Sequence, residues 1–190
     1  WEASLKAMKI IATFILAALL AAAITSTSAA SPPNSDDDQM KALKKAVDDA
    51  SAAYQASTND VGGELWKTYQ QVIVTNLPQI LDLAQKNPVS QTAFEMLSWI
   101  AMKGLYERGP VFTNRIQAVE MLAKYQATNS EVGPLCSFIG HNWEWRWREK
   151  PILDFLRAVA KNNPDRAIRS QAIFGLGRVY ASKSEELVEL

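Results

Sequence analysis

The chain has 190 residues, enough for one domain of ordinary size or for one domain preceded by a targeting segment. Its 20 Lys and Arg residues balance its 20 Asp and Glu residues, so it lacks the excess positive charge that is typical of nucleic-acid-binding proteins. The single cysteine, Cys136, excludes a disulfide within the chain, and stability therefore has to come from packing.

The first thirty residues have the layout of a secretory signal peptide. A short basic stretch precedes an apolar run over residues 10–24, and small side chains at Ser28 and Ala30 suit a signal peptidase. The run is shorter than the ~20 residues that a permanent membrane helix needs. We therefore expect residues 1–30 to hold an N-terminal extension and a signal peptide that starts at Met8 and is cleaved after Ala30; a retained anchor is the alternative. The chain is then exported, to a periplasmic or extracytoplasmic location, and meets the membrane only transiently.

A polar, proline-containing stretch over residues 31–38 is expected to be a disordered lead-in. Its three aspartates suit the positive end of the helix that follows. From there the sequence predicts one helical domain over residues 39–190. The first helix is marked by apolar side chains three and four residues apart, namely Met40, Leu43, Val47, Ala50 and Tyr54. A break at residues 62–63 precedes a second amphipathic stretch over residues 65–76.

Three pairs of helices are predicted next. In the first pair, Pro78 begins a helix, a turn falls at Asn87 and Pro88, and an apolar helix follows; residues 107–114 are expected to be a loop. The second pair covers residues 116–139, with its turn at residues 128–130. The third pair runs from Pro151 through the turn at Asn163 and Pro164. Its last helix is predicted from apolar residues at helical spacing, namely Ile168, Ala172, Ile173, Leu176 and Tyr180.

The turns at positions 88, 129 and 164 are 41 and 35 residues apart. A period of roughly 34 to 47 residues, with two helices in each unit, is typical of TPR-like and HEAT-like solenoids. We therefore predict an all-α fold: an array of antiparallel helical hairpins, forming either a right-handed TPR/HEAT-like solenoid or an irregular helical bundle.

Two glycines fall inside the last predicted helix. Gly175 and Gly177 each cost about 1 kcal/mol relative to alanine in a helix interior. Phosphate binding is disfavoured, because no strand precedes the Gly-x-Gly. We predict instead that a neighbouring helix approaches closely at both glycines.

The sequence contains no complete catalytic site. Cys136 and the only histidine, His141, are five residues apart, a spacing that points them in different directions on a helix. We expect Cys136 to be a buried structural thiol. One histidine and one cysteine cannot supply the ligands of a zinc site, so neither a metal nor a cofactor is predicted.

The most unusual stretch is the connection over residues 141–150. Trp143, Trp145 and Trp147 alternate along it, with Arg146 among them, and they could form a stacking platform for bases, sugars or a peptide. The structural interpretation, which we favour, is that the tryptophans cover the gap between two hairpins. These four residues are the candidate contacts for a ligand or partner.

Several phrases of the sequence together resemble a known family. They are ILDLAQKNP (80–88), AVEMLAKY (118–125), EVGPLC (131–136) and FLRAVAKNNPDRAIRSQAIFGLGRVY (155–180). Over about 110 residues the chain resembles the exported helical region that precedes a thioredoxin-like (TlpA/redoxin) domain in a group of bacterial proteins. No Cys-x-x-Cys occurs here, so the resemblance implies a redox centre beyond Leu190 or none, and it assigns no catalytic residue to this chain.

Together these features predict an exported helical-repeat interaction or scaffold region without catalysis of its own. The pattern over residues 185–190 stops without a helix-ending signal, so we expect a truncated C-terminus. The partner is a protein or the chain's own downstream domain, and not a nucleic acid. The resemblance implies that the full-length protein is a thiol-disulfide oxidoreductase. The alternative is an accessory region of an exported enzyme that binds a glycan or peptide through the Trp143, Trp145 and Trp147 cluster.

Overall fold

The computed structural model describes residues 35–57, 63–103, 110–141 and 149–188. Within these ranges the chain forms helices and no strand, which confirms the all-α prediction. The helices are α2 (Asp36–Ala56), α3 (Glu64–Lys86), α4 (Gln91–Met102), α5 (Pro110–Tyr125), α6 (Gly133–His141), α7 (Glu149–Asn162) and α8 (Arg166–Val188). None of the helices in the described ranges combines the length and apolar character that crossing a membrane requires. The predicted signal peptide, residues 1–30, lies outside these ranges.

The start of α2 follows from the polar residues around it. Ser35 is the N-cap, and its hydroxyl accepts a hydrogen bond from the backbone N–H of Asp38 at 3.1 Å. Three aspartates fill the first turn, where the helix dipole favours negative charge. The helix therefore begins at Asp36, earlier than the predicted boundary at residue 39, because capping draws these residues into it. Met40 and Val47 are buried, as their spacing predicts.

Helix α3 overturns the prediction that Pro78 begins a helix. One helix runs from Glu64 to Lys86 with Pro78 inside it. A proline there removes a backbone hydrogen bond and usually costs about 3 kcal/mol or more. The apolar stripe nevertheless continues across the proline, and its buried members are Tyr69, Ile73, Leu77, Ile80, Leu81 and Ala84. Because this whole stripe is buried, packing holds the two halves in one helix.

A second correction concerns the predicted loop over residues 107–114. Helix α5 begins at Pro110, and proline suits the first helical position because its missing N–H would have no helical acceptor there. The dipeptide Gly109-Pro110 predicts a loop in this segment. In the structure the chain is helical from Pro110 onward, and the polar residues Asn114 and Arg115 are buried in α5, with 7% and 2% of their surface exposed.

Short polar side chains shape the turns that precede α4, α6 and α8. Ser90 caps α4 by accepting a hydrogen bond from the N–H of Ala93 at 3.1 Å. The Asn129 side chain accepts one from the N–H of Glu131 at 2.8 Å, ahead of α6. Asp165 accepts hydrogen bonds from two N–H groups in the first turn of α8. The turns predicted near positions 88, 129 and 164 are therefore confirmed.

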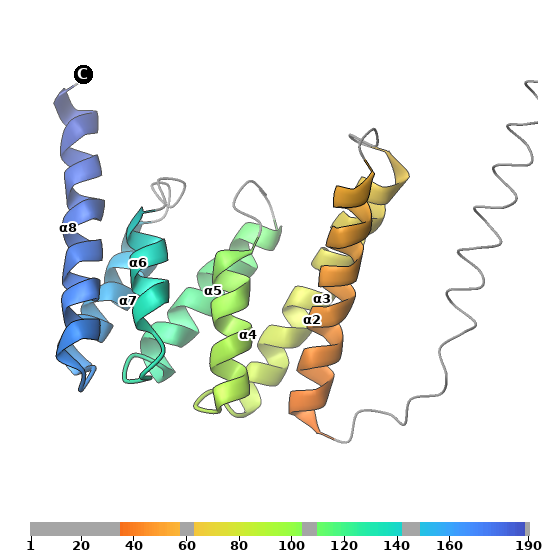
Figure 1. Ribbon diagram of the computed structural model, residues 1–190, viewed down its shortest axis with the longest axis horizontal. Helices are drawn as coiled ribbons and strands as arrows, with labels where there is room; N and C mark the ends of the chain where they lie inside the picture. Colours follow the sequence, from red (N-terminus) through yellow and green to blue (C-terminus); the bar gives the residue numbers. More distant parts are fainter. Residues whose placement is uncertain (1–34, 58–62, 104–109, 142–148, 189–190) are drawn as a thin grey trace, which may run out of the picture. The chain divides into compact units, whose positions relative to one another are not determined.

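The helices pack in two alternating sets, visible as two rows in Figure 1. Helices α2, α4, α6 and α8 contact one another in succession, and so do α3, α5 and α7. Contacts of α2 with α3, of α4 with α5 and of α7 with α8 join the two sets. One hydrophobic core results, and its fully buried members include Ile73, Leu97, Leu122, Ile139 and Phe155.

The crossing of α6 and α8 depends on glycine. A Cβ atom added to Gly140 would lie 2.5 Å from the Cα atom of Gly175, and one added to Gly175 would lie 3.1 Å from the Cys136 carbonyl oxygen. The close approach predicted at Gly175 is therefore confirmed. Among the residues that the structure describes, the same prediction is wrong for Gly177, because a Cβ there would meet none of their atoms within 4 Å.

Helix α8 buries only part of the apolar set that its pattern predicts, and Leu176 of that set packs partly buried against the core. Ile168 and Ala172 are buried, whereas Ile173 and Tyr180 are exposed. The Tyr180 ring is half-exposed, but its hydroxyl accepts a hydrogen bond from the Arg157 guanidinium of α7 at 2.5 Å.

Candidate functional site

Cys136 lies in the middle of α6, the short helix that packs against α8. Its side chain is fully buried in the hydrophobic core. Burial disfavours the charged thiolate and raises the pKa of the Cys136 thiol to about 12. The prediction of a buried structural thiol is confirmed, because a nucleophilic cysteine needs a lowered pKa and access to solvent.

The reactivity of Cys136 tests this environment. At pH 8 we expect the thiol to react with 5,5′-dithiobis(2-nitrobenzoate) roughly a thousandfold more slowly in the native protein than in 8 M urea, because only the thiolate attacks. The absorbance of the released thionitrobenzoate measures both rates. Similar rates in the two states would mean that Cys136 is accessible in the folded chain.

His141 ends α6 and is exposed. Its Nδ1 atom lies 2.7 Å from the carbonyl oxygen of Ser137. Because a carbonyl can only accept, Nδ1 carries the proton and donates this hydrogen bond. The imidazole ring also lies beside the Phe174 ring of α8, with 5.8 Å between the ring centroids. His141 is thus engaged by Ser137 and Phe174, and Cys136 and His141 are not brought together as a nucleophile and base.

The remaining candidate residues fall outside the structure's described ranges. Trp143, Trp145, Arg146 and Trp147 belong to residues 142–148, so the proposed stacking platform stays a prediction. Among the described residues, no group of three or more His, Cys, Asp or Glu side chains is placed to hold a metal ion.

A network of side-chain amides connects the turns at one end of the helices. The Gln126 amide, in the turn after α5, donates hydrogen bonds to the carbonyl oxygens of Pro88 and Ser90 at 2.7 and 3.2 Å. The Asn163 amide, in the turn after α7, donates to the carbonyl oxygens of Ala127 and Asn129 at 2.9 and 3.0 Å. Each amide therefore binds two carbonyl groups of the preceding turn. The two carbonyl-bearing residues are separated by two positions in both turns.

These bonds form a continuous path across the three turns. The Asn129 amide donates to the Gln126 side-chain oxygen at 3.1 Å, and so links the first set of bonds to the second. Asn163 and Gln126 are almost fully buried, with 2% and 3% exposure. At the other end, Lys86 pairs with Asp36 at 2.9 Å, which connects the first turn to the start of α2. Buried amides with all their partners present fix the spacing of successive turns.

No protein family, curated protein or solved structure matches this chain. The resemblance to the helical region of TlpA/redoxin proteins therefore stays a prediction. The function has to be argued from the geometry of the chain itself.

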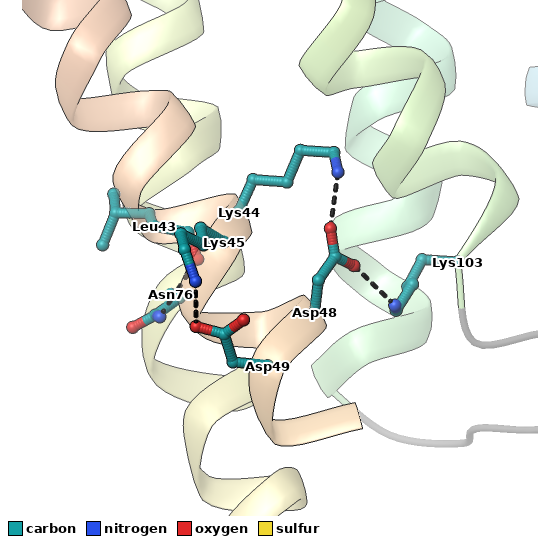
Figure 2. Close-up of polar contacts among 7 residues, drawn as sticks. All are labelled: Leu43, Lys44, Lys45, Asp48, Asp49, Asn76 and Lys103. Atoms are coloured by element: carbon teal, nitrogen blue, oxygen red, sulfur yellow. Dashed lines mark hydrogen bonds and ion pairs between the residues drawn. The ribbon is translucent and has the colours of Figure 1, made fainter. Parts of the chain in front are cut away.

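A second polar cluster joins α2 to the end of α4 (Figure 2). The Asp48 carboxylate binds Lys44 through one oxygen at 2.5 Å and Lys103 through the other at 3.0 Å. Both lysine Nζ atoms also lie over the Trp99 ring, 5.2 and 5.3 Å from its centroid. Burial by itself would raise the pKa of Asp48, but hydrogen bonds and charge from Lys44 and Lys103 outweigh burial and hold it below its ordinary value.

Substitution of Asp48 measures the strength of this cluster. We expect Asp48→Asn to lower the free energy of unfolding by up to about 1 kcal/mol at pH 7, since the group is partly exposed. The pKa of Asp48 is lower in the folded state than its ordinary value of 3.8. The stability that its ion pairs add is therefore complete above pH 3.8 and is lost as the pH falls through the folded-state pKa. Urea titrations at pH 7 and pH 3 provide the measurement.

The matched control is Asp49→Asn on the neighbouring residue. Asp49 binds Lys45 at 2.6 Å, but both side chains are mostly exposed. We expect this variant to change stability by less than about 0.5 kcal/mol. An equal loss in the two variants would show that the bridge from α2 to α4 adds nothing to stability.

A surface cleft of about 340 Å³ opens between α5 and α7. Glu120, Ala123 and Lys124 line it from α5, and Lys150, Pro151 and Asp154 line it from α7. Lys150 pairs with Asp154 at 2.5 Å. The lining thus carries two positive and two negative groups, which suits a polar peptide surface better than an apolar small molecule.

Sequence reasoning identified the turns but missed the amide network. Asn163 before Pro164 indicates a turn, but no local pattern points to the contacts of Gln126 or Asn163. The available signal was the distance between these two amide residues, 37 positions, which lies within the range of two-helix repeats.

Proposed function

We propose that this chain is an exported helical-repeat scaffold that binds a protein partner and catalyses no reaction itself. The observation that supports this most strongly is the repeated bonding of Gln126 and Asn163, each to two carbonyls of the preceding turn. Such equivalent contacts between successive units are expected of a TPR-like or HEAT-like stack, in which each unit contacts mainly its neighbours.

The alternating packing adds support to a stack of two-helix units. Each described helix contacts the helix two positions along the chain, in both sets of helices. A hairpin that cannot bury its apolar face alone needs such neighbours. Cys136 is buried in the core, which favours binding over thiol chemistry as the role of this segment.

The cleft between α5 and α7 is the proposed partner contact. Lys124 and Lys150 lie on opposite sides of it, so one extended segment in the cleft could meet both. Its balanced charges and the neutral chain favour a protein segment of mixed charge over a nucleic acid.

Photocrosslinking in the organism of origin tests this contact. A benzophenone amino acid placed at Lys124 should form a discrete adduct with a protein, and the same group at the exposed Lys41 of α2 should not. Adding Lys150→Glu should abolish the adduct. The cleft would then carry three negative groups and no lysine, so it would no longer attract the acidic groups of a partner segment. Adducts of equal yield at both positions, or none at either, would contradict a partner in the cleft.

The export and redoxin parts of the proposal have separate tests. N-terminal sequencing of the chain from the extracytoplasmic fraction should begin at Ser31, and recovery in the cytoplasm with Met8 retained would contradict export. The resemblance proposes a thioredoxin-like domain as the neighbour of this scaffold. An in-frame Cys-x-x-Cys in the coding sequence after Leu190 would support that neighbour, and a stop codon without one would exclude it.

A further inference from the structure

The two walls of the cleft between α5 and α7 differ in how their charges are used. On the α7 wall, the Asp154 carboxylate binds Lys150 through one oxygen at 2.5 Å, and its other oxygen lies 3.6 Å from the Arg157 guanidinium. Opposite charges this close together largely cancel each other's field at a third group. The two charged groups that line this wall, Lys150 and Asp154, are therefore already paired with each other.

On the α5 wall the two charges remain separate. Glu120 and Lys124 are both exposed and lie one helical turn apart. Their order and spacing would suit an ion pair within the helix. Among the residues that the structure describes, however, neither side chain forms an ion pair, and the Lys124 Nζ atom lies 4.7 Å from the centroid of the Tyr125 ring. One negative and one positive group of the cleft are thus open to a partner.

The size of the cleft favours an extended segment over a helix. One helical turn with its side chains is about 10–12 Å wide and 5.4 Å long, which corresponds to roughly 400–600 Å³. The cleft holds about 340 Å³. Its two uncharged lining residues, Ala123 and Pro151, have short side chains that leave room for a single extended backbone.

We infer that the occupant of this cleft is an extended protein segment with a basic side chain opposite Glu120 and an acidic side chain opposite Lys124. The inference rests on the partner contact proposed above and specifies the chemistry that this contact selects. A uniformly acidic segment would be repelled by Glu120, and a uniformly basic one by Lys124. An apolar segment would cover both charges without supplying either with a counter-charge.

The spacing of the two open charges sets the spacing of charges in the partner. Four residues of α-helix rise about 6 Å, so Glu120 and Lys124 are about that far apart along α5. In an extended segment, side chains two residues apart point to the same side and are separated by about 6.6 Å. The partner segment should therefore carry its basic and acidic residues with one residue between them, in either chain direction.

Photocrosslinking from Ala123 tests the open charges one at a time. A diazirine amino acid at this position leaves all four charged lining residues in place. In this background Glu120→Gln and Lys124→Gln should each lower the yield of the protein adduct about threefold, because each removes one ion pair with the partner. Removing the closed pair as a unit, with Lys150→Gln and Asp154→Asn together, should leave the yield within about 1.5-fold.

Glu95→Gln on α4 and Lys41→Gln on α2 are the matched controls. Both residues are exposed and lie outside the cleft, so neither substitution should change the yield. Mass spectrometry of the adduct should place the crosslink beside a basic and an acidic residue separated by one position.

Three outcomes would overturn this inference. An adduct whose yield ignores Glu120→Gln and Lys124→Gln, or whose crosslinked segment carries charges of one sign only, would leave a partner in the cleft without the selection described. An equal loss in the Lys150→Gln, Asp154→Asn double variant would show that the α7 wall selects as well. No adduct from position 123 in any background would instead contradict the partner contact itself, and this inference with it.

Discussion

Asn163→Ala is expected to lower the free energy of unfolding by about 3 kcal/mol. The Asn163 side chain is 2% exposed and donates to two carbonyl oxygens of the preceding turn. Alanine would leave the carbonyls of Ala127 and Asn129 without these donors, and each buried acceptor that loses its partner costs about 1–3 kcal/mol. Its own oxygen also accepts from the N–H of Asp165 at 3.0 Å, so the start of α8 would loosen as well.

Asn162→Ala is the matched control for this loss. Asn162 is the last residue of α7 and is exposed. The same substitution at this position therefore deletes only an amide that was in contact with solvent. We expect a change within about 0.5 kcal/mol. Equilibrium urea unfolding gives both values, and amide exchange at residues 127–129 should become faster only in Asn163→Ala. Equal stabilities for the two variants would show that the amide network does not hold the turns together.

Gly140→Ala is expected to cost at least about 2 kcal/mol, although alanine is the better helix former. The new methyl group would lie 2.5 Å from the Cα atom of Gly175. That neighbour is backbone, so no side-chain rotation relieves the overlap and α6 has to move away from α8. Such a shift would open the core around Cys136 and Leu156, whose side chains are buried beside this crossing.

Gly177→Ala provides the opposite result in the same pair of helices. No atom of the described residues lies within 4 Å of the position of its methyl group, so among them only the gain in helix propensity remains. We expect about 0.5–1 kcal/mol of added stability from this variant. The two alanine variants should therefore move the urea midpoint in opposite directions. A loss in both would indicate that α8 packs differently from the arrangement described here.

The existence and type of the helices followed from local patterns. Apolar side chains at intervals of three and four residues predicted α2 and α4, and Asn163 with Pro164 predicted the turn before α8. The error at Pro78 arose because the proline's local cost was considered without the burial of the stripe around it. Gly109-Pro110 suggests a loop over residues 107–114, whereas Pro110 takes the first position of α5 and Asn114 is buried in that helix.

The candidate surfaces were harder to predict. The sequence marked Gly175 and Gly177 equally, and both lie in the same helix. Only the packing of α6 against α8 separates them, because a glycine's role depends on which atoms lie beyond its missing side chain.

The sequence by itself determined that the described part of this chain is helical, where its turns fall and that its only cysteine belongs in a core. Those properties depend on residues close together along the chain. The tertiary structure alone decided that Gln126 and Asn163 bind the preceding turns and that Gly140 meets Gly175. Each of these contacts joins residues about 35 positions apart, and periodicity along one helix cannot specify which other helix it meets or at what height.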